Sequence, residues 1–243
     1  MNPPPSESPL IGTWLSIGSP VIAELAGACG FDWVLIDLEH GCASEAALPS
    51  QIRALRGSST RCIVRVPAHR PDLIGRALDW GAHGIMIPHV DTAEQAEAAV
   101  RAAYYPPRGT RGYSRSVRAW NYGLRTADPE AFSPLILPQI ESAQAVANAP
   151  GIARVQGVTA LFVGPADLQF DLRNGGAKLP DEYQQSLVSV VAASRDAGKA
   201  AGILAREPSD FATFSSLGFA YIAVDSDLSI LRNAYTRMLS AKG

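Results

Sequence analysis

Lysine is the scarcest charged residue in this chain. The 243 residues include only Lys178, Lys199 and Lys242. An enzyme that works through a Schiff base needs a lysine desolvated inside its active site. Lys178 lies in a Gly-rich loop, Lys199 precedes a predicted strand and Lys242 is next to the C-terminus, so none is placed for that role. The scarcity favours metal-assisted chemistry over a lysine adduct.

Cysteine is also rare. There are three cysteines, at positions 29, 42 and 62, and none forms a C-x-x-C pair. An odd number without metal-ligand spacing predicts free thiols in a reducing, cytoplasmic compartment. We expect none of the three to be catalytic, because no feature of the sequence marks one as a nucleophile.

Signals for membranes and nucleic acids are missing as well. No apolar run reaches the ~18 residues that a bilayer-spanning helix needs. The formal net charge of −2 lacks the basic excess typical of nucleic-acid binding, so we expect neither partner. Residues 1–9 are rich in proline and serine, lack the regions of a signal peptide, and predict a flexible tail.

The chain does contain a regular alternation of short apolar runs and Ala-rich segments of helical period. The expected strands are 11–17, 33–38, 62–66, 84–88, 135–140, 160–163, 201–204 and 221–224. The expected helices are 20–29, 44–56, 71–80, 92–103, 142–148, 181–197, 208–217 and 227–239. Eight strand–helix pairs predict one α/β domain over residues 10–243, a closed (β/α)₈ TIM barrel. A doubly wound open sheet is the alternative, disfavoured because no G-x-G-x-x-G follows the first strand.

The segment 104–134 interrupts this alternation. It contains no clear strand, and it interleaves five arginines with Tyr113, Trp120 and Tyr122. A loop of this length in a compact domain is usually functional or disordered. One interpretation is a solvated loop that packs on its own barrel. The other is a rim element that helps to close a site or a subunit contact.

Polar residues cluster where the predicted strands end, which is where barrels carry their chemistry. Glu141 and Asp167 follow the neighbouring fifth and sixth strands, and two such carboxylates can share a hard cation such as Mg²⁺ or Mn²⁺. The alternative is that each carboxylate caps a following helix, and Asp167 stands where an N-cap would. An arginine in a strand, Arg65, needs an anion, either a substrate or a carboxylate of the chain.

A general base is the next candidate. His40 follows the second strand, and Asp37 is its predicted orienting partner, since a His–carboxylate pair exchanges protons near neutral pH. A structural histidine bonded to the backbone is the alternative reading of His40. His89, after the fourth strand, is a weaker rival, whereas His69 and His83 are expected to be peripheral.

Six motifs then resemble one family. The motifs are FDWVLIDLEHG at 31–41, VRVP at 64–67, GAHGIMIPH at 81–89, YPPRGTRG at 105–112, PQIES at 138–142 and FVGPADL at 162–168. They are similar to the signatures of the HpcH/HpaI aldolases, the 4-hydroxy-2-oxoheptanedioate aldolase family, over about residues 10–240. The resemblance implies a barrel whose last helix packs on a neighbouring subunit, assembled as a homohexamer of three dimers. The linker after Gly112 differs more from the family pattern.

The resemblance also implies roles for individual residues. Metal ligands would be Glu141 and Asp167, with Mg²⁺, Mn²⁺ or Co²⁺ as cofactor. Gln139 would orient the substrate, and the backbone from Gly164 through Pro165 and Ala166 to Asp167 would hold a pyruvate carboxylate. The enolate would be stabilised by Arg65. His40 with Asp37 would move protons through a water, and Asp79 would reach a site across a subunit contact.

These expectations combine into a class II aldolase that cleaves a 4-hydroxy-2-oxo acid to pyruvate and an aldehyde through a pyruvate enolate. Trp14 and Leu204, at the ends of strands one and seven, are expected to shape the aldehyde side of the pocket. Two alternatives stay open. One is a related lyase or synthase that uses the same enolate with acyl-CoA or a dicarboxylic oxo acid, and the other is a catalytically silent barrel that serves as a binding protein.

Overall fold

The chain forms a closed barrel of eight parallel strands in sequence order, as predicted. The computed structural model describes residues 8–240, so most of the predicted tail and Lys242 lie outside the described residues. The strands are β1 (Leu10–Leu15), β2 (Trp33–Asp37), β3 (Arg61–Arg65), β4 (Gly84–Ile87), β5 (Leu135–Ile140), β6 (Ala160–Val163), β7 (Ala200–Ala205) and β8 (Tyr221–Ser226).

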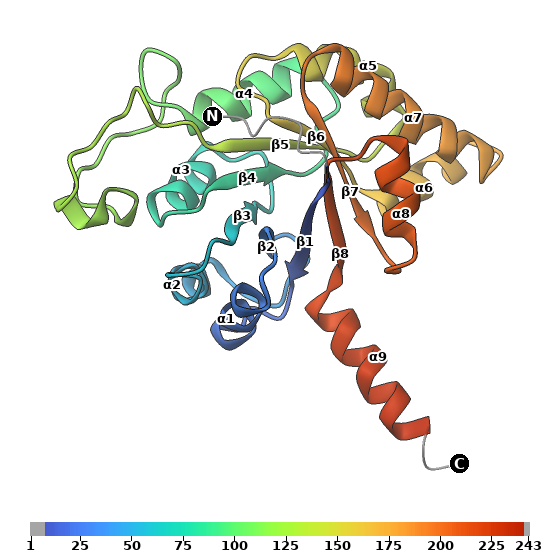
Figure 1. Cartoon of the computed structure of the whole chain (residues 1–243). Helices are drawn as coiled ribbons and strands as arrows, with labels where there is room; N and C mark the ends of the chain where they lie inside the picture. Colours follow the sequence, from blue (N-terminus) through green and yellow to red (C-terminus); the bar gives the residue numbers. More distant parts are fainter. Residues whose placement is uncertain (1–7, 241–243) are drawn as a thin grey trace.

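Helices connect the strands on the outside of the barrel (Figure 1). They are α1 (Pro20–Cys29), α2 (Leu48–Ala54), α3 (Pro71–Asp79), α4 (Ala93–Ala103), α5 (Ala143–Arg154), α6 (Pro165–Asn174), α7 (Asp181–Asp196), α8 (Asp210–Leu217) and α9 (Asp227–Ser240), with the 3₁₀ turns η1 (Glu45–Ala47) and η2 (Arg118–Gly123). None of the helices within residues 8–240 has the length and hydropathy to cross a membrane.

Two helices depart from the sequence-based expectation. The expected stop of α5 at residue 148 is wrong, because the helix continues through Pro150 to Arg154 and buries Ile152 and Ala153 against the sheet. Tertiary burial here outweighs the local cost of the proline. The expected set also lacks α6, which begins at Pro165 directly after β6. This extra helix matters because it opens beside the strand ends.

The lower interior of the barrel is filled by aromatic rings. The ring centroid of Trp33 lies 6.0 Å from that of Phe162 and 6.2 Å from that of Tyr221. Two glycines leave the room that the rings occupy. A Cβ at Gly12 would come within 2.2 Å of Trp33, and one at Gly202 within 2.4 Å of Phe162. Side chains therefore close the barrel axis below the strand ends.

Two segments extend beyond the barrel in Figure 1. The segment 104–134 (green) runs out past α3 before it returns to β5, and it includes η2, which contacts α3. Since it joins the end of α4 to the start of β5, it belongs to the N-terminal end of the barrel. It therefore lies away from the strand ends of its own barrel, and a role in closing a site or a subunit contact stays a prediction. The other segment is α9 (red), which points away from the strands and buries only Asp227.

Candidate active site

The strand ends bring Asp37, Arg65 and Gln139 together inside the barrel. Asp37 and Arg65 are register partners on the parallel pair β2 and β3. Alternate residues of a strand face the same side, so both follow the interior residues Leu35 and Ile63. The three polar side chains are buried, with exposures of 2%, 3% and 0% respectively. Burial of charged groups here requires that they satisfy one another.

The guanidinium group of Arg65 is held by contacts with four residues. Its Nε and Nη2 donate to the two carboxylate oxygens of Asp37 at 2.9 and 2.7 Å. Nη1 lies 2.7 Å from Oε2 of Glu39 and donates to Oε1 of Gln139 at 3.4 Å. The guanidinium carbon lies 4.3 Å from the centre of the Trp14 ring. A planar fork paired in this way has little freedom to move, so the group is preorganised.

The predicted pairing of the His40 ring with Asp37 is wrong. Both oxygens of Asp37 are engaged by Arg65, and Oδ1 also accepts the backbone N–H groups of Glu39 and His40 at 3.0 and 3.3 Å. The His40 side chain is 66% exposed, and its Nε2 lies 3.9 Å from Oε1 of Glu39. Arg65, on the neighbouring strand β3, binds both oxygens of the Asp37 carboxylate. Asp37 therefore orients the backbone of His40 and not its ring.

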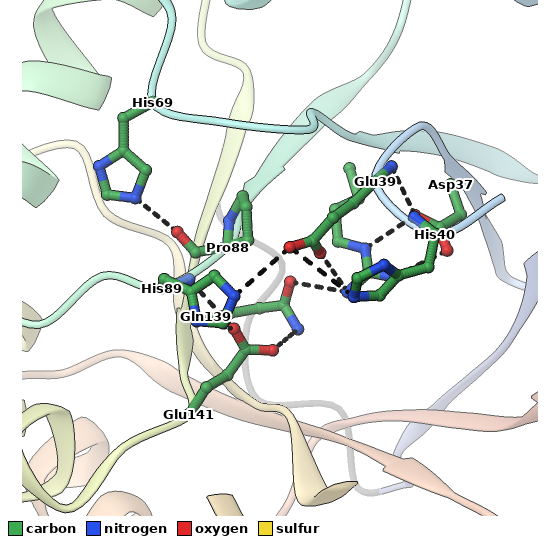
Figure 2. A network of polar contacts seen from close by, with 9 residues as sticks. Asp37, Glu39, His40, His69, Pro88, His89, Gln139 and Glu141 are labelled. Carbon is green, nitrogen blue, oxygen red and sulfur yellow. Dashed lines mark hydrogen bonds and ion pairs between the residues drawn. The ribbon is translucent and has the colours of Figure 1, made fainter. Parts of the chain in front are cut away.

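Glu39 is a site residue that the sequence analysis did not single out. Its carboxylate lies between three cationic or titratable groups: Arg65, His40 and His89, whose Nε2 is 3.5 Å from Oε1 (Figure 2). The side chain is only 9% exposed. The available signal was its position directly after β2. Strand alternation assigns it to the interior face that Leu35 and Asp37 share.

Glu141 is a second buried carboxylate of the site. Its Oε1 accepts from Nε2 of Gln139 at 2.6 Å, and its Oε2 accepts the backbone N–H of His89 at 3.1 Å. The His89 ring lies over the same oxygen, with Nδ1 at 3.2 Å. Burial raises the pKa of Glu141, and the negative charges of Asp167 and Glu39 act in the same direction. A positive charge nearby would therefore stabilise the ionised form of Glu141.

Asp167 does not cap a helix. Gly164 occupies the N-cap position of α6, and Asp167 lies in the first turn. A Cβ at Gly164 would stand 2.2 Å from Oε1 of Glu141, so only glycine allows the opening of α6 to approach that carboxylate. Pro165 lacks an N–H, whereas the amides of Ala166 and Asp167 open the helix without an intrahelical acceptor. The site thus combines a second carboxylate with amide donors for an anion.

The donor set fits a hard divalent cation. Glu141 and Asp167 supply carboxylate oxygens, and a cation between them would relieve the mutual repulsion that raises the pKa of Glu141. Among residues 8–240, no three histidine, cysteine or acidic side chains form a complete metal cage. Two protein ligands would leave coordination positions for a substrate. Lysine is absent from this cluster in the described part of the chain, since Lys178 and Lys199 lie elsewhere.

Comparisons with known proteins identify the family of this chain. Residues 10–234 match the model of the HpcH/HpaI aldolase/citrate lyase family. The chain belongs to this family. The 5-keto-4-deoxy-D-glucarate aldolase of Klebsiella pneumoniae is 38% identical over 95% of this chain and 91% of that protein. That of Escherichia coli O6:H1 is 40% identical over 94% and 90%.

Solved structures of the HpcH/HpaI family share the fold. A family protein from Burkholderia cenocepacia J2315 has a TM-score of 0.90 and 36% identity, covering 96% of this chain and 94% of that one. The citrate synthase SbnG has a TM-score of 0.84 and 27% identity, with coverages of 97% and 93%. The resemblance seen in the six motifs is confirmed, and the chain is a carbon–carbon lyase of the HpcH/HpaI type.

The remaining predicted residues of this HpcH/HpaI protein fall into two places. Trp14 stacks on Arg65, and Leu204 belongs to the same interior cluster as Trp14. Asp79 ends α3, at the opposite end of the barrel, where its Oδ1 lies 2.5 Å from Nη2 of Arg111. The structure therefore does not bring Asp79 together with the site of its own chain.

Proposed function

We propose that this chain is a metal-dependent class II aldolase that reversibly cleaves a 4-hydroxy-2-oxo acid into pyruvate and an aldehyde. The observation that carries the proposal is the fixed guanidinium of Arg65, which Gln139 links to the carboxylate of Glu141, on which the charge of Asp167 also acts. A preorganised cation at this point is suited to a substrate oxygen on which negative charge develops. No lysine of the described residues stands there to form a Schiff base.

The metal would be held by Glu141 and Asp167. When bound, Mg²⁺, Mn²⁺ or Co²⁺ would supply Lewis acidity toward the carboxylate and keto oxygen of a 2-oxo acid. The amides of Ala166 and Asp167 orient the carboxylate of the substrate, and the Gln139 amide fixes Glu141 through its 2.6 Å hydrogen bond.

Different residues of the chain move the proton and stabilise the negative charge. His40 removes the proton from the C4 hydroxyl, directly or through a water, and the electron pair of the O–H bond forms the aldehyde as the C3–C4 bond breaks. The electron pair of that bond remains on pyruvate as the enolate, whose oxygen accepts from Arg65. Asp37 acts as a positioning residue for Arg65. Protonation of the enolate carbon completes the formation of pyruvate.

The relatives supply the first substrate to test. Because two aldolases named for 5-keto-4-deoxy-D-glucarate align over nearly the whole chain, we take a hydroxylated 2-oxo diacid of this type as the first substrate to test. Trp14 and Leu204 form the apolar wall on the aldehyde side. The wall accepts carbon chains of several lengths, so the aldehyde is expected to vary more than pyruvate does.

The test is turnover with and without metal. The enzyme should release pyruvate from 5-keto-4-deoxy-D-glucarate, lose this activity after exhaustive chelation, and regain it with Mg²⁺, Mn²⁺ or Co²⁺. It should also exchange the methyl protons of pyruvate with deuterium by NMR, since exchange passes through the same enolate. Full activity after chelation, or a borohydride-trapped adduct on lysine, contradicts the proposal.

A second candidate is a synthase that uses the same enolate, because the citrate synthase SbnG shares the fold at 27% identity. In that case the chain would join an enolate to a dicarboxylic oxo acid or an acyl-CoA. Turnover of pyruvate with a simple aldehyde in the absence of CoA favours the aldolase. Loss of all metal-dependent turnover favours a binding protein.

The oligomer is also a proposal. α9 exposes a row of large apolar side chains, with exposures from 44% to 71%: Leu228, Ile230, Tyr235, Met238 and Leu239. We expect this helix to pack on a neighbouring subunit of a homohexamer, and Asp79 to enter the site of a neighbour. Sedimentation of the full chain should give a hexamer, and Met238→Glu with Leu239→Glu should reduce its mass.

A further inference from the structure

An arginine-lined cavity lies at the end of the barrel opposite to the strand ends. It has a volume of about 270 Å³, and the four arginines among its lining residues are Arg53, Arg56, Arg118 and Arg125. Arg53 is in the last turn of α2, and Arg56 follows it. Arg118 and Arg125 come from the segment 104–134, to which the proposed aldolase reaction assigns no role. Two elements that are distant in sequence thus place their guanidinium groups around one space.

The four charges are not neutralised by the chain. No acidic residue lines the cavity, and within residues 8–240 no carboxylate forms an ion pair with any of the four. Like charges around a small space repel one another unless an anion enters it. The charge of Arg118 also acts on a neighbouring group. The pKa of His83 is lowered by burial, then by the charge of Arg61 and then by that of Arg118.

Two of the arginines in the cavity wall are held in place by contacts with the rest of the chain. Arg118 donates from Nη1 to the carbonyl oxygen of Trp80 at 3.0 Å. Arg125 donates to the carbonyl oxygen of Ala119, and its guanidinium carbon lies 5.3 Å from the Trp120 ring. These contacts fix two of the four guanidinium groups, while the exposed Arg53 and Arg56 are free to close on a ligand.

The backbone of the wall is strained in the same place. Asn121 has φ 51° and Tyr122 has φ 57°, a left-handed conformation that two consecutive non-glycine residues rarely share. Both residues line the cavity. Such strain persists only where the surroundings determine it. The turn holds Arg118 and Arg125 on the same side of the cavity.

We propose that this cavity binds the phosphoryl group of a small phosphorylated metabolite, at a site separate from the aldolase centre. A phosphate accepts hydrogen bonds from several directions, which suits guanidinium forks that converge from two elements. A second cavity of about 460 Å³ shares Ala119 and Arg125 with the first and is lined by Leu78, Trp120 and Phe132. It offers room for the organic part of such a ligand.

The experiment measures pyrophosphate binding to the full chain by isothermal titration calorimetry, in buffer with chelator and at constant ionic strength. Chelator prevents a pyrophosphate–metal complex, and constant salt removes general screening effects. We expect one saturable site per chain. Arg53→Gln with Arg56→Gln should weaken binding by ~10-fold or more, because charge-assisted hydrogen bonds to the anion are lost.

The control changes the same charge elsewhere. Arg154→Gln with Arg195→Gln removes two exposed arginines outside the cavity, each of them, like Arg53, in the last turn of its helix. This variant should bind pyrophosphate within about 2-fold of the wild type, as distant exposed charges are screened. Equal weakening in both variants, or no saturable binding by the wild type, overturns the proposal.

Two further outcomes would also overturn the proposal. Tighter binding of citrate than of pyrophosphate, with the same dependence on Arg53 and Arg56, overturns the phosphoryl assignment in favour of a polycarboxylate. A smaller oligomer for the Arg53/Arg56 variant, with unchanged pyrophosphate binding, shows a contact between copies and overturns the site. Retro-aldol turnover of the variant, assayed with metal and without pyrophosphate, should stay at the wild-type level, so the two proposals fail separately.

Discussion

The two ends of the barrel surround arginine in opposite ways. At the strand ends, Arg65 is 3% exposed and lies between Asp37 and Glu39. At the other end, Arg53 and Arg56 are exposed beside a cavity without a carboxylate. The first guanidinium is held by the chain before any ligand arrives, and the second pair depends on a ligand for its counter-charge. The chain therefore fixes the position of the guanidinium group at the strand ends. At the opposite end, a bound ligand would fix the positions of the Arg53 and Arg56 guanidinium groups.

The largest expected effect is that of Arg65→Ala. It should depress aldol cleavage and deuterium uptake into pyruvate together, by ~10²–10³-fold, the usual value of one donor to a developing oxyanion. It should also lower the free energy of unfolding by about 3–5 kcal/mol, because Asp37 and Glu39 stay buried without their partner. Steady-state kinetics, NMR exchange and urea unfolding measure the three effects.

Arg65→Lys is the matched variant. It restores a charge but not the fork, so it should recover part of the stability and little of the activity. Wild-type exchange in Arg65→Ala with loss of cleavage alone would move Arg65 from the enolate to the aldehyde portion.

His40→Ala should have a more selective effect, which falls on catalysis and not on stability. Loss of a positioned proton-transfer group costs ~10²–10⁴-fold in kcat, and cleavage should fall more than pyruvate exchange. Stability should hardly change, since the side chain is 66% exposed. Parallel kinetics of His89→Ala supply the comparison: normal turnover in His40→Ala with a deficit in His89→Ala transfers the role to His89.

At the opposite end, Arg111→Ala tests whether a buried arginine stabilises without catalysing. The Arg111 side chain is 1% exposed, and its guanidinium carbon lies 4.6 Å from the ring centre of Tyr105 and 4.7 Å from that of Phe132. The cavity and the broken pair with Asp79 should lower the free energy of unfolding by about 2–4 kcal/mol.

The control for Arg111 is Arg115→Ala in the same segment. Arg115 is exposed, so the change should stay within about 0.5 kcal/mol. Thermal and urea unfolding compare the two variants. Equal stability of both would show that the buried contacts of Arg111 contribute nothing.

The smallest effect concerns His83, whose pKa is lowered by burial and by the charges of Arg61 and Arg118. The neutral ring accepts the N–H of Cys62 at Nδ1, at 3.0 Å. Below the ordinary pKa of about 6.5 the unfolded chain takes up a proton that the folded chain resists, so stability falls as the pH falls. His83→Gln should make the acid slope shallower, by at most ~1.4 kcal/mol per pH unit. An unchanged slope in urea unfolding from pH 7 to 5 contradicts the assignment.

The sequence predicted the strands better than the contacts between their ends. Parallel strands buried on both faces are apolar throughout, so β5 and β6 have the predicted bounds. By contrast, α6 was not expected, because its buried residues Leu168 and Leu172 stand in an otherwise polar run. Local periodicity is a weak signal for a helix of this kind.

The site shows the same limit. Positions at strand ends drew attention to Arg65 and Asp37, but their pairing depends on register. A residue's neighbour across a parallel pair is fixed by the whole sheet and not by nearby sequence. Glu39 was overlooked for a related reason: alternation places it on the interior face, but its contacts with Arg65 and His89 come from other strands.

The aromatic layer of Trp33, Phe162 and Tyr221 has a consequence for combining mutations. These rings fill the barrel axis between the strand ends, where Arg65 lies, and the opposite end, where the arginine cavity lies. Substitutions that share no partner and lie far apart change stability additively, within about 0.3–0.5 kcal/mol. A double-mutant cycle between Arg65→Lys and Arg53→Gln should therefore give a coupling energy near zero. Each end can then be redesigned without adjusting the other, with Gly12 and Gly202 kept as they are so that the rings retain their places.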